Sequence, residues 1–115
     1  MKEENVFWVG TQPLLEKKGP VLADDESFVA AISATCEAAG CRVGRFVSAL
    51  GPYGTWVIEI QRDGKDQRIV WNGKEERLVL QVELSQGGWE DPLAIEIDNK
   101  DADGFVAGVT RLLND

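Results

Sequence analysis

The sequence predicts an α+β fold in which a four- to five-stranded antiparallel sheet carries two helices on one face. Apolar and polar residues alternate between residues 54 and 84, and two short turn sequences interrupt them, which is typical of a three-stranded meander. Two further segments, about 25–39 and 101–113, repeat apolar residues with helical spacing. Such helices bury their apolar stripes most simply against one face of the sheet. The length of 115 residues indicates a single domain, residues 1–115.

The N-terminal part predicts an edge strand and then the first helix. Residues 5–9, Asn-Val-Phe-Trp-Val, have strand composition. The run Asp24-Asp25-Glu26-Ser27 supplies an N-cap, and Gly40 is suited to end the helix. Thr35 falls on the apolar stripe, where it can be buried if its hydroxyl donates to the carbonyl one turn earlier. The rest of the stripe is Phe28, Ala31, Ile32 and Ala39, with Val29 and Cys36 beside it.

Residues 41–50 predict the next strand but leave its buried face open. Val43 and Val47 alternate with Arg42 and Phe46, as expected for a strand with two different faces. Arg45, however, falls on the same face as the valines. Either face can therefore meet the core.

The meander fixes its own register through Asp63-Gly64. This pair is typical of a two-residue type I′ turn, in which both residues need a positive φ. The turn sets Trp56 opposite Trp71 and Glu59 opposite Arg68, and alternation puts both tryptophans on the face that we expect to be buried. The third strand adds Leu78, Leu80, Val82 and Leu84 to that face.

The face opposite the tryptophans carries charged residues and three valines. A four-residue loop at 73–76 would align Val57, Val70 and Val79 in one row. The valines either reflect β-propensity alone or form a contact strip, and both interpretations stay open.

The last third predicts a loop, a fifth strand and the second helix. Residues 85–92 contain Gly87 and Gly88 and are expected to form a loop that carries Trp89. Residues 93–98 alternate as a strand with Leu93, Ile95 and Ile97 inward, and the helical stripe is Phe105, Val109, Leu112 and Leu113 with Val106 beside it.

Composition excludes several classes of site. The chain has no histidine, which removes Ser-His-Asp and Cys-His catalytic pairs and histidine-ligated metals. Two cysteines, Cys36 and Cys41, are too few for a cysteine-rich zinc site. No signal peptide or membrane span is visible, so we expect a cytoplasmic protein with reduced thiols. The formal net charge of −8 disfavours nucleic acid and anionic membranes as partners and favours a basic protein.

Residues 99–106 resemble the start of a calcium-binding loop. Oxygen ligands alternate through Asp101 and Asp103, and Gly104 follows at the position of the invariant glycine. The twelfth position is Thr110, however, where a bidentate glutamate is needed. A helix cap at Asp101 explains the same residues, so we predict no metal site and no cofactor.

Acidic residues are concentrated toward the C-terminus. Residues 83–103 contain one base and seven acids, 1 − 7 = −6, whereas residues 59–77 are balanced. Trp89 lies within the acidic stretch, and aromatic residues commonly anchor protein interfaces. We therefore predict a partner-binding surface made of Trp89, Glu90, Asp91, Glu96, Asp98, Asp101 and Asp103.

These observations favour a small acidic protein-binding module over an enzyme, because nothing in the sequence buries a carboxylate and raises its pKa for acid–base work. The module would neutralise or escort a basic partner. In size, acidity and lack of catalytic residues it is similar to bacterial immunity proteins, which inhibit toxic nucleases and other effectors, although no motif carries the similarity. The alternatives are a carboxylate-based or calcium-binding ligand-binding or enzymatic domain, and a structural homodimer that uses Val57, Val70 and Val79.

Overall fold

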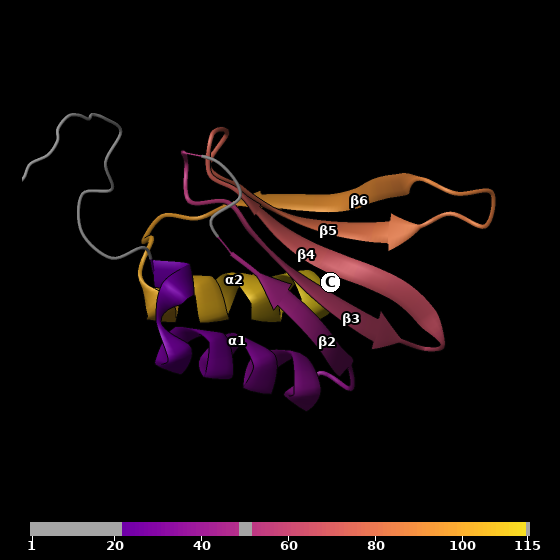
Figure 1. Cartoon of the computed structure of the whole chain (residues 1–115), viewed down its shortest axis with the longest axis horizontal. Coiled ribbons are helices and arrows are strands. Elements are labelled where there is room, and N and C mark those ends of the chain that lie inside the picture. The colour runs from indigo at the N-terminus through magenta and orange to yellow at the C-terminus, as the bar shows by residue number, and fades with distance from the viewer. Residues whose placement is uncertain (1–21, 49–51, 115) are drawn as a thin grey trace, which may run out of the picture.

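The computed structural model describes residues 22–48 and 52–114, which form a five-stranded antiparallel sheet with two helices on one face (Figure 1). The predicted fold class is thereby confirmed. The strand expected at residues 5–9 lies outside the described residues. The strands are adjacent in chain order: β2 (Arg42–Val47), β3 (Trp56–Arg62), β4 (Lys65–Asn72), β5 (Arg77–Glu83) and β6 (Trp89–Glu96). A short 3₁₀ turn, η1 (Leu22–Asp24), precedes helix α1 (Glu26–Ala38), and helix α2 (Ala102–Asn114) follows β6.

Helix α1 begins and ends as its sequence predicts. The side chain of Asp25 accepts a hydrogen bond from the backbone N–H of Ser27 at 2.8 Å, which caps the helix. Gly40 has a φ of +88°, the left-handed conformation that usually ends a helix. The Thr35 hydroxyl donates to the Ala31 carbonyl at 2.7 Å, so its polar group is satisfied within the helix.

The register of the meander is also confirmed. Asp63 and Gly64 have φ values of 55° and 73°, as a type I′ turn requires. Trp56 lies opposite Trp71, and Glu59 lies opposite Arg68. One turn sequence therefore specifies which residues of two strands face the helices.

The buried face of β2, which the sequence leaves open, is decided by a β-bulge. Val43 pairs with Ile60 and Phe46 pairs with Ile58, and the register shifts between the two pairs. Because a bulge adds one residue to the strand, both Val43 and Phe46 pack against the core. Strict alternation would have placed them on opposite faces.

The prediction for residues 85–92 is wrong, because β6 begins at Trp89 rather than Leu93. Gly87 and Gly88, with φ values of 94° and 86°, form a shorter turn than expected. The β5–β6 register shifts between Leu80 and Val82, and Pro92 lies at this irregularity. Proline in a strand is typical of edge strands and bulges. Because the apolar–polar alternation stops at Pro92, it does not reveal the first residues of β6 as part of a strand. Beyond it the predicted inward residues are confirmed: Leu93 and Ile95 pack against the core, and Ile97 is buried.

The core lies between the sheet and the two helices and is built around aromatic rings. Phe105 of α2 stacks edge-on against Trp71 and Trp56, with ring centroids 4.9 and 5.7 Å apart. Phe28 of α1 completes the cluster, 5.6 Å from Trp56. Helix α2 approaches the sheet closely at Gly108, where an added Cβ would lie 2.5 Å from Cδ1 of Ile97. No helix among the described residues is long and apolar enough to cross a membrane.

Candidate partner-binding surface

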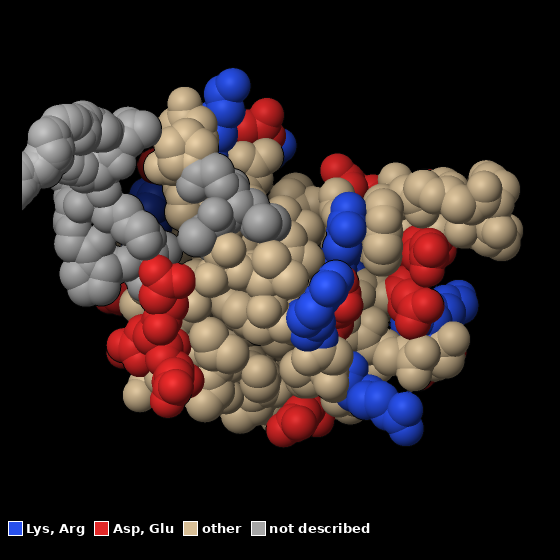
Figure 2. Space-filling view, in the orientation of Figure 1, with Lys and Arg blue, Asp and Glu red and all other residues tan. Residues whose placement is uncertain are grey.

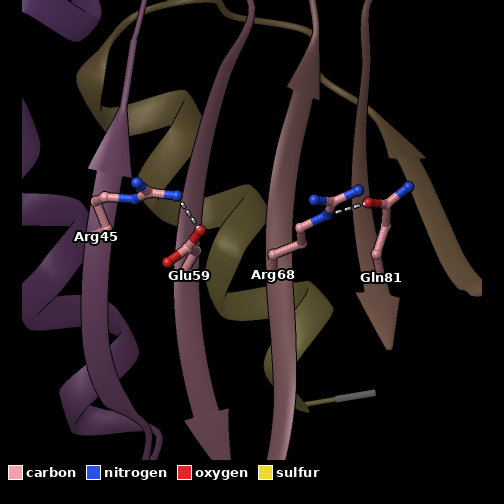
Figure 3. Close-up of polar contacts among 4 residues, drawn as sticks. All are labelled: Arg45, Glu59, Arg68 and Gln81. Carbon is pink, nitrogen blue, oxygen red and sulfur yellow. Dashed lines mark hydrogen bonds and ion pairs between the residues drawn. The ribbon is translucent and has the colours of Figure 1, made fainter. Parts of the chain in front are cut away.

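The helices cover only one face of the sheet and lie behind the strands in Figure 3. No described element covers the other face, which we call the outer face (Figure 1). An apolar row crosses all five strands on the outer face. Its residues pair consecutively from strand to strand and are half-buried apart from the exposed Ala94: Val47, Val57, Val70, Val79 and Ala94. The three valines predicted to form one row therefore do so, and the row extends to both edges of the sheet.

Beside the apolar row runs a row of polar side chains that bond to one another across the strands (Figure 3). Arg45 donates to Glu59 at 3.0 Å, and the Nε of Arg68 donates to Oε1 of Gln81 at 2.6 Å. The amide of Gln81 in turn donates to Asp91 at 2.8 Å. Glu59 and Arg68 lie opposite each other, as the turn predicts, but Glu59 forms its ion pair with Arg45 on the other neighbouring strand. Figure 2 shows acidic and basic side chains interspersed over the strands.

Trp89 belongs to the outer face, since it pairs with Glu83 at the first position of β6. The guanidinium carbon of Arg68 lies over the Trp89 ring, 4.0 Å from its centroid. Such a cation–π contact contributes about 0.5–1 kcal/mol at an exposed site. Trp89 remains 36% exposed. Arg68 therefore holds the ring over the sheet, Gln81 accepts a hydrogen bond from Arg68, and Asp91 accepts one from Gln81.

A hollow of about 270 Å³, which we call the Trp89 hollow, lies beside this ring. It is lined by Glu59, Ile60, Asp66, Gln67, Glu83 and Trp89. Glu59 pairs with Arg45, and Asp66 accepts a hydrogen bond from Gln61 at 3.1 Å. Within residues 22–48 and 52–114, the Glu83 carboxylate has no hydrogen-bond or ion-pair partner. The hollow thus combines an aromatic wall with an uncompensated acid.

The residues predicted to form one surface fall into two groups at opposite ends of β6. Trp89 and Asp91 lie together on the outer face, whereas Glu90 pairs with Val82 on the side of the helices. Glu96 lies at the other end of this eight-residue strand, opposite Arg77. At about 3.3 Å per residue, the strand separates the groups by roughly 25 Å. The second group is Glu96, Asp98, Asp101 and Asp103.

The second group has a structural explanation in the start of α2. The side chain of Asp101 accepts a hydrogen bond from the backbone N–H of Gly104 at 2.8 Å, and Asp103 lies in the first turn. A Cβ on residue 104 would lie 1.8 Å from the Asn99 carbonyl oxygen, so only glycine fits there. The calcium-loop spacing therefore arises here from a helix cap and a close backbone contact. Among the described residues, no three Cys, Asp or Glu side chains are grouped so that they could hold a metal ion.

The cysteines are unsuited to nucleophilic chemistry. Both Cys36 and Cys41 are buried free thiols. Burial, with smaller contributions from Cys41 and Glu37, raises the pKa of Cys36 from 9.0 to about 12. Burial likewise raises the pKa of Cys41. At neutral pH both side chains are therefore protonated, whereas the reactive species is the thiolate.

Sequence reasoning missed the side chains that surround Trp89. The sequence does not mark Arg68, Gln81 or Asp66 as site residues. It shows Glu83 only as one of the seven acids in residues 83–103. The turn at Asp63-Gly64 places the β3 and β4 residues of this group on one face. Their proximity to Trp89, however, depends on the register shift in β5–β6, for which the sequence has no signal beyond Pro92.

Comparison with protein-family models, curated protein sequences and solved structures finds no match for this chain.

Proposed function

We propose that the chain is an acidic protein-binding module whose partner is a basic protein. The observation that carries the proposal is the composition of the outer face, which combines a half-buried valine row, an exposed Trp89 and a polar border. Protein interfaces have this anatomy: an apolar or aromatic centre, where few residues supply most of the affinity, inside a polar rim. No described element covers the face.

The net charge of −8 supports a basic partner, because opposite charge speeds diffusional encounter. The acids near the start of α2, at the far end of β6, would contribute to this long-range attraction without touching the partner. A basic toxin or other effector, neutralised or escorted by the chain, fits these properties. The module would act by covering its partner's surface, with no cofactor and no reaction of its own.

The test begins by recovering basic proteins from a native lysate on the immobilised chain. Each recovered protein is then purified, and its binding is measured by surface plasmon resonance. We expect a saturable complex whose association rate falls steeply as salt rises. Trp89→Ala should weaken affinity roughly 30-fold or more, the effect of losing about 2 kcal/mol at an interface anchor. Circular dichroism of the variant controls for folding. If Trp89→Ala and Val70→Asp both leave the affinity unchanged, the outer face is not the binding surface.

A structural homodimer is the second candidate, because the apolar row continues across all five strands. The net charge of each copy opposes this association. Sedimentation equilibrium decides between the candidates: a dimer that Val70→Lys dissociates would favour self-association.

A further inference from the structure

We infer that the outer face docks its partner through the Trp89 hollow, which receives an arginine side chain of the basic protein. This inference rests on the proposed function and adds the chemistry of the contact at its centre. It commits the docking surface to the outer face near Trp89 rather than to the acids at the start of α2.

The charge balance of the hollow calls for one more cation. Three carboxylates, Glu59, Asp66 and Glu83, line it, and two guanidinium groups, Arg45 and Arg68, contact its walls, which leaves 2 − 3 = −1. Arg45 is committed to Glu59 at 3.0 Å. Of the three carboxylates, only that of Glu83, on the β5 strand beside Trp89, has neither a hydrogen bond nor an ion pair within the described residues. A partner's side-chain cation would complete the charge pairing on a face that the complex shields from water.

The size and shape of the hollow favour a side chain over other cations. Its volume of about 270 Å³ lies below the roughly 300–1,000 Å³ typical of small-molecule sites, so it suits one residue of a protein partner. The carboxylates come from three neighbouring strands, and they do not form a group that could hold a metal ion. A guanidinium group, which is larger and flat, can bond to separated carboxylates.

The Trp89 wall favours arginine over lysine. Arginine stacks on aromatic rings and bonds carboxylates with two parallel donors, whereas the lysine ammonium is a compact, strongly hydrated charge. The internal contact of Arg68 with the Trp89 ring at 4.0 Å is an example of this stacking within the chain itself. Because Arg68 is also bonded to Gln81 at 2.6 Å, the ring is held in place before binding, which lowers the entropy lost in the complex.

The apolar row extends the docking surface away from the hollow. Val79 on β5 and Val70 on β4 lie on the same face as Glu83 and Arg68, two to four residues along their strands. A partner that inserts an arginine beside Trp89 therefore covers half-buried valines with its neighbouring residues. Apolar contact around a desolvated charge pair is the arrangement found at the centres of strong interfaces.

The experiment uses the full chain and three blocked pentapeptides of the form Gly-Gly-X-Gly-Gly, in which X is arginine, lysine or the neutral arginine analogue citrulline. Titrations at low salt are followed by ¹H–¹⁵N NMR, with the Trp89 indole N–H and the backbone of Asp66 and Glu83 as reporters. We expect the arginine peptide to shift these signals with millimolar affinity, the lysine peptide to bind at least threefold more weakly, and the citrulline peptide not to bind.

The matched variants are Glu83→Gln and Asp103→Asn, each of which removes one negative charge from an exposed position. Glu83→Gln should weaken arginine-peptide binding at least fivefold, and Asp103→Asn less than twofold. Asp66→Asn is a second hollow variant that should also weaken binding, and the spectra themselves report whether each variant is folded.

Equal weakening by Glu83→Gln and Asp103→Asn would overturn the inference, because binding would then follow net charge alone. Binding of the citrulline peptide, stronger binding of the lysine peptide, or shifts confined to other residues would overturn it as well. The proposed function fails separately. If a basic partner's affinity depends on Val70 but not on Glu83 or Trp89, the proposed function holds and the inference about the Trp89 hollow is wrong. If the chain has no basic partner, the proposed function is wrong.

Discussion

The two faces of the sheet are built from the same strands and both carry apolar residues, yet these residues are buried to different degrees. Ile69 is fully buried, and the next residue of β4, Val70, is only half-buried. The inner face meets two helices and a cluster of aromatic rings, so its contacts run from the sheet to the helix layer packed on it. The contacts of the outer face run sideways, from strand to strand, through Arg45, Glu59, Arg68 and Gln81.

Alternation of apolar and polar residues does not by itself show which apolar residues stabilise the fold. Central side chains of the inner face such as Ile58, Ile69 and Leu78 lose all their contact with water, whereas the valines of the outer face keep part of theirs. The remaining exposed area on the outer face is available to a partner. Substitutions that separate stability from binding should therefore divide along the plane of the sheet.

The largest expected effect is that of Trp71→Ala. Trp71 is 5% exposed and its ring packs 4.9 Å from that of Phe105. Removing an aromatic side chain from a core costs about 3–5 kcal/mol, a large part of the roughly 5–15 kcal/mol by which domains are stable. Urea unfolding measures the loss. An unchanged unfolding midpoint would mean that the inner face is not the core.

Two neighbouring residues of β4 give the most direct test of how much each face contributes to stability. Ile69→Ala should lower the free energy of unfolding by about 2–5 kcal/mol because it opens a cavity in the core. Val70→Ala, one residue later on the outer face, should cost about 1 kcal/mol or less. Urea titrations of both variants give the two values. Similar losses would show that the outer face is covered in solution by part of the chain or by a second copy.

A smaller effect concerns the buried thiol of Cys36. Its pKa is about 12 in the folded chain against 9.0 for the ordinary group, so the folded state disfavours the thiolate. Because the folded-state pKa is the higher one, this stabilisation is complete below about pH 9 and is lost as pH rises toward 12. At pH 10 the loss is about 1.4 kcal/mol, one pKa unit of free energy. Unfolding of the wild type and of Cys36→Ala at pH 8 and pH 10 tests it. The variant should lose less stability between the two pH values, and equal losses would contradict the burial of an ionisable thiol.

Prediction from sequence succeeded where residues close together in the chain determine the structure by themselves. Asp63-Gly64 fixed one turn and through it the pairing of Trp56 with Trp71, and Thr35 revealed its own hydrogen bond by its place on the apolar stripe. The failures came from the bulges in β2 and β6. A bulge inserts one residue and exchanges the faces beyond it, and its position depends on the packing of the neighbouring strand.

The candidate site was limited by the same cause. Trp89 and Asp91 were identified from their residue types, but their neighbours across the sheet were not. Glu59 and Asp66 are distant from Trp89 in sequence, and only the shifted β5–β6 register brings them to one hollow. The acids at the start of α2 were assigned to the same surface because they are close in sequence, although a whole strand separates them from Trp89.

The irregularity at Pro92 also affects how the chain behaves when it is concentrated. Among the described strands β6 lies at one edge of the sheet, where unpaired backbone groups invite further chains to add on as strands and grow into fibrils. Pro92 has no N–H to offer, the shifted register bends the edge, and Glu90, Asp91 and Glu96 repel an identical strand laid beside them. Edge-to-edge polymerisation is therefore opposed at β6 by its own sequence. The outer face can therefore stay uncovered while the β6 edge resists pairing with copies of the same chain.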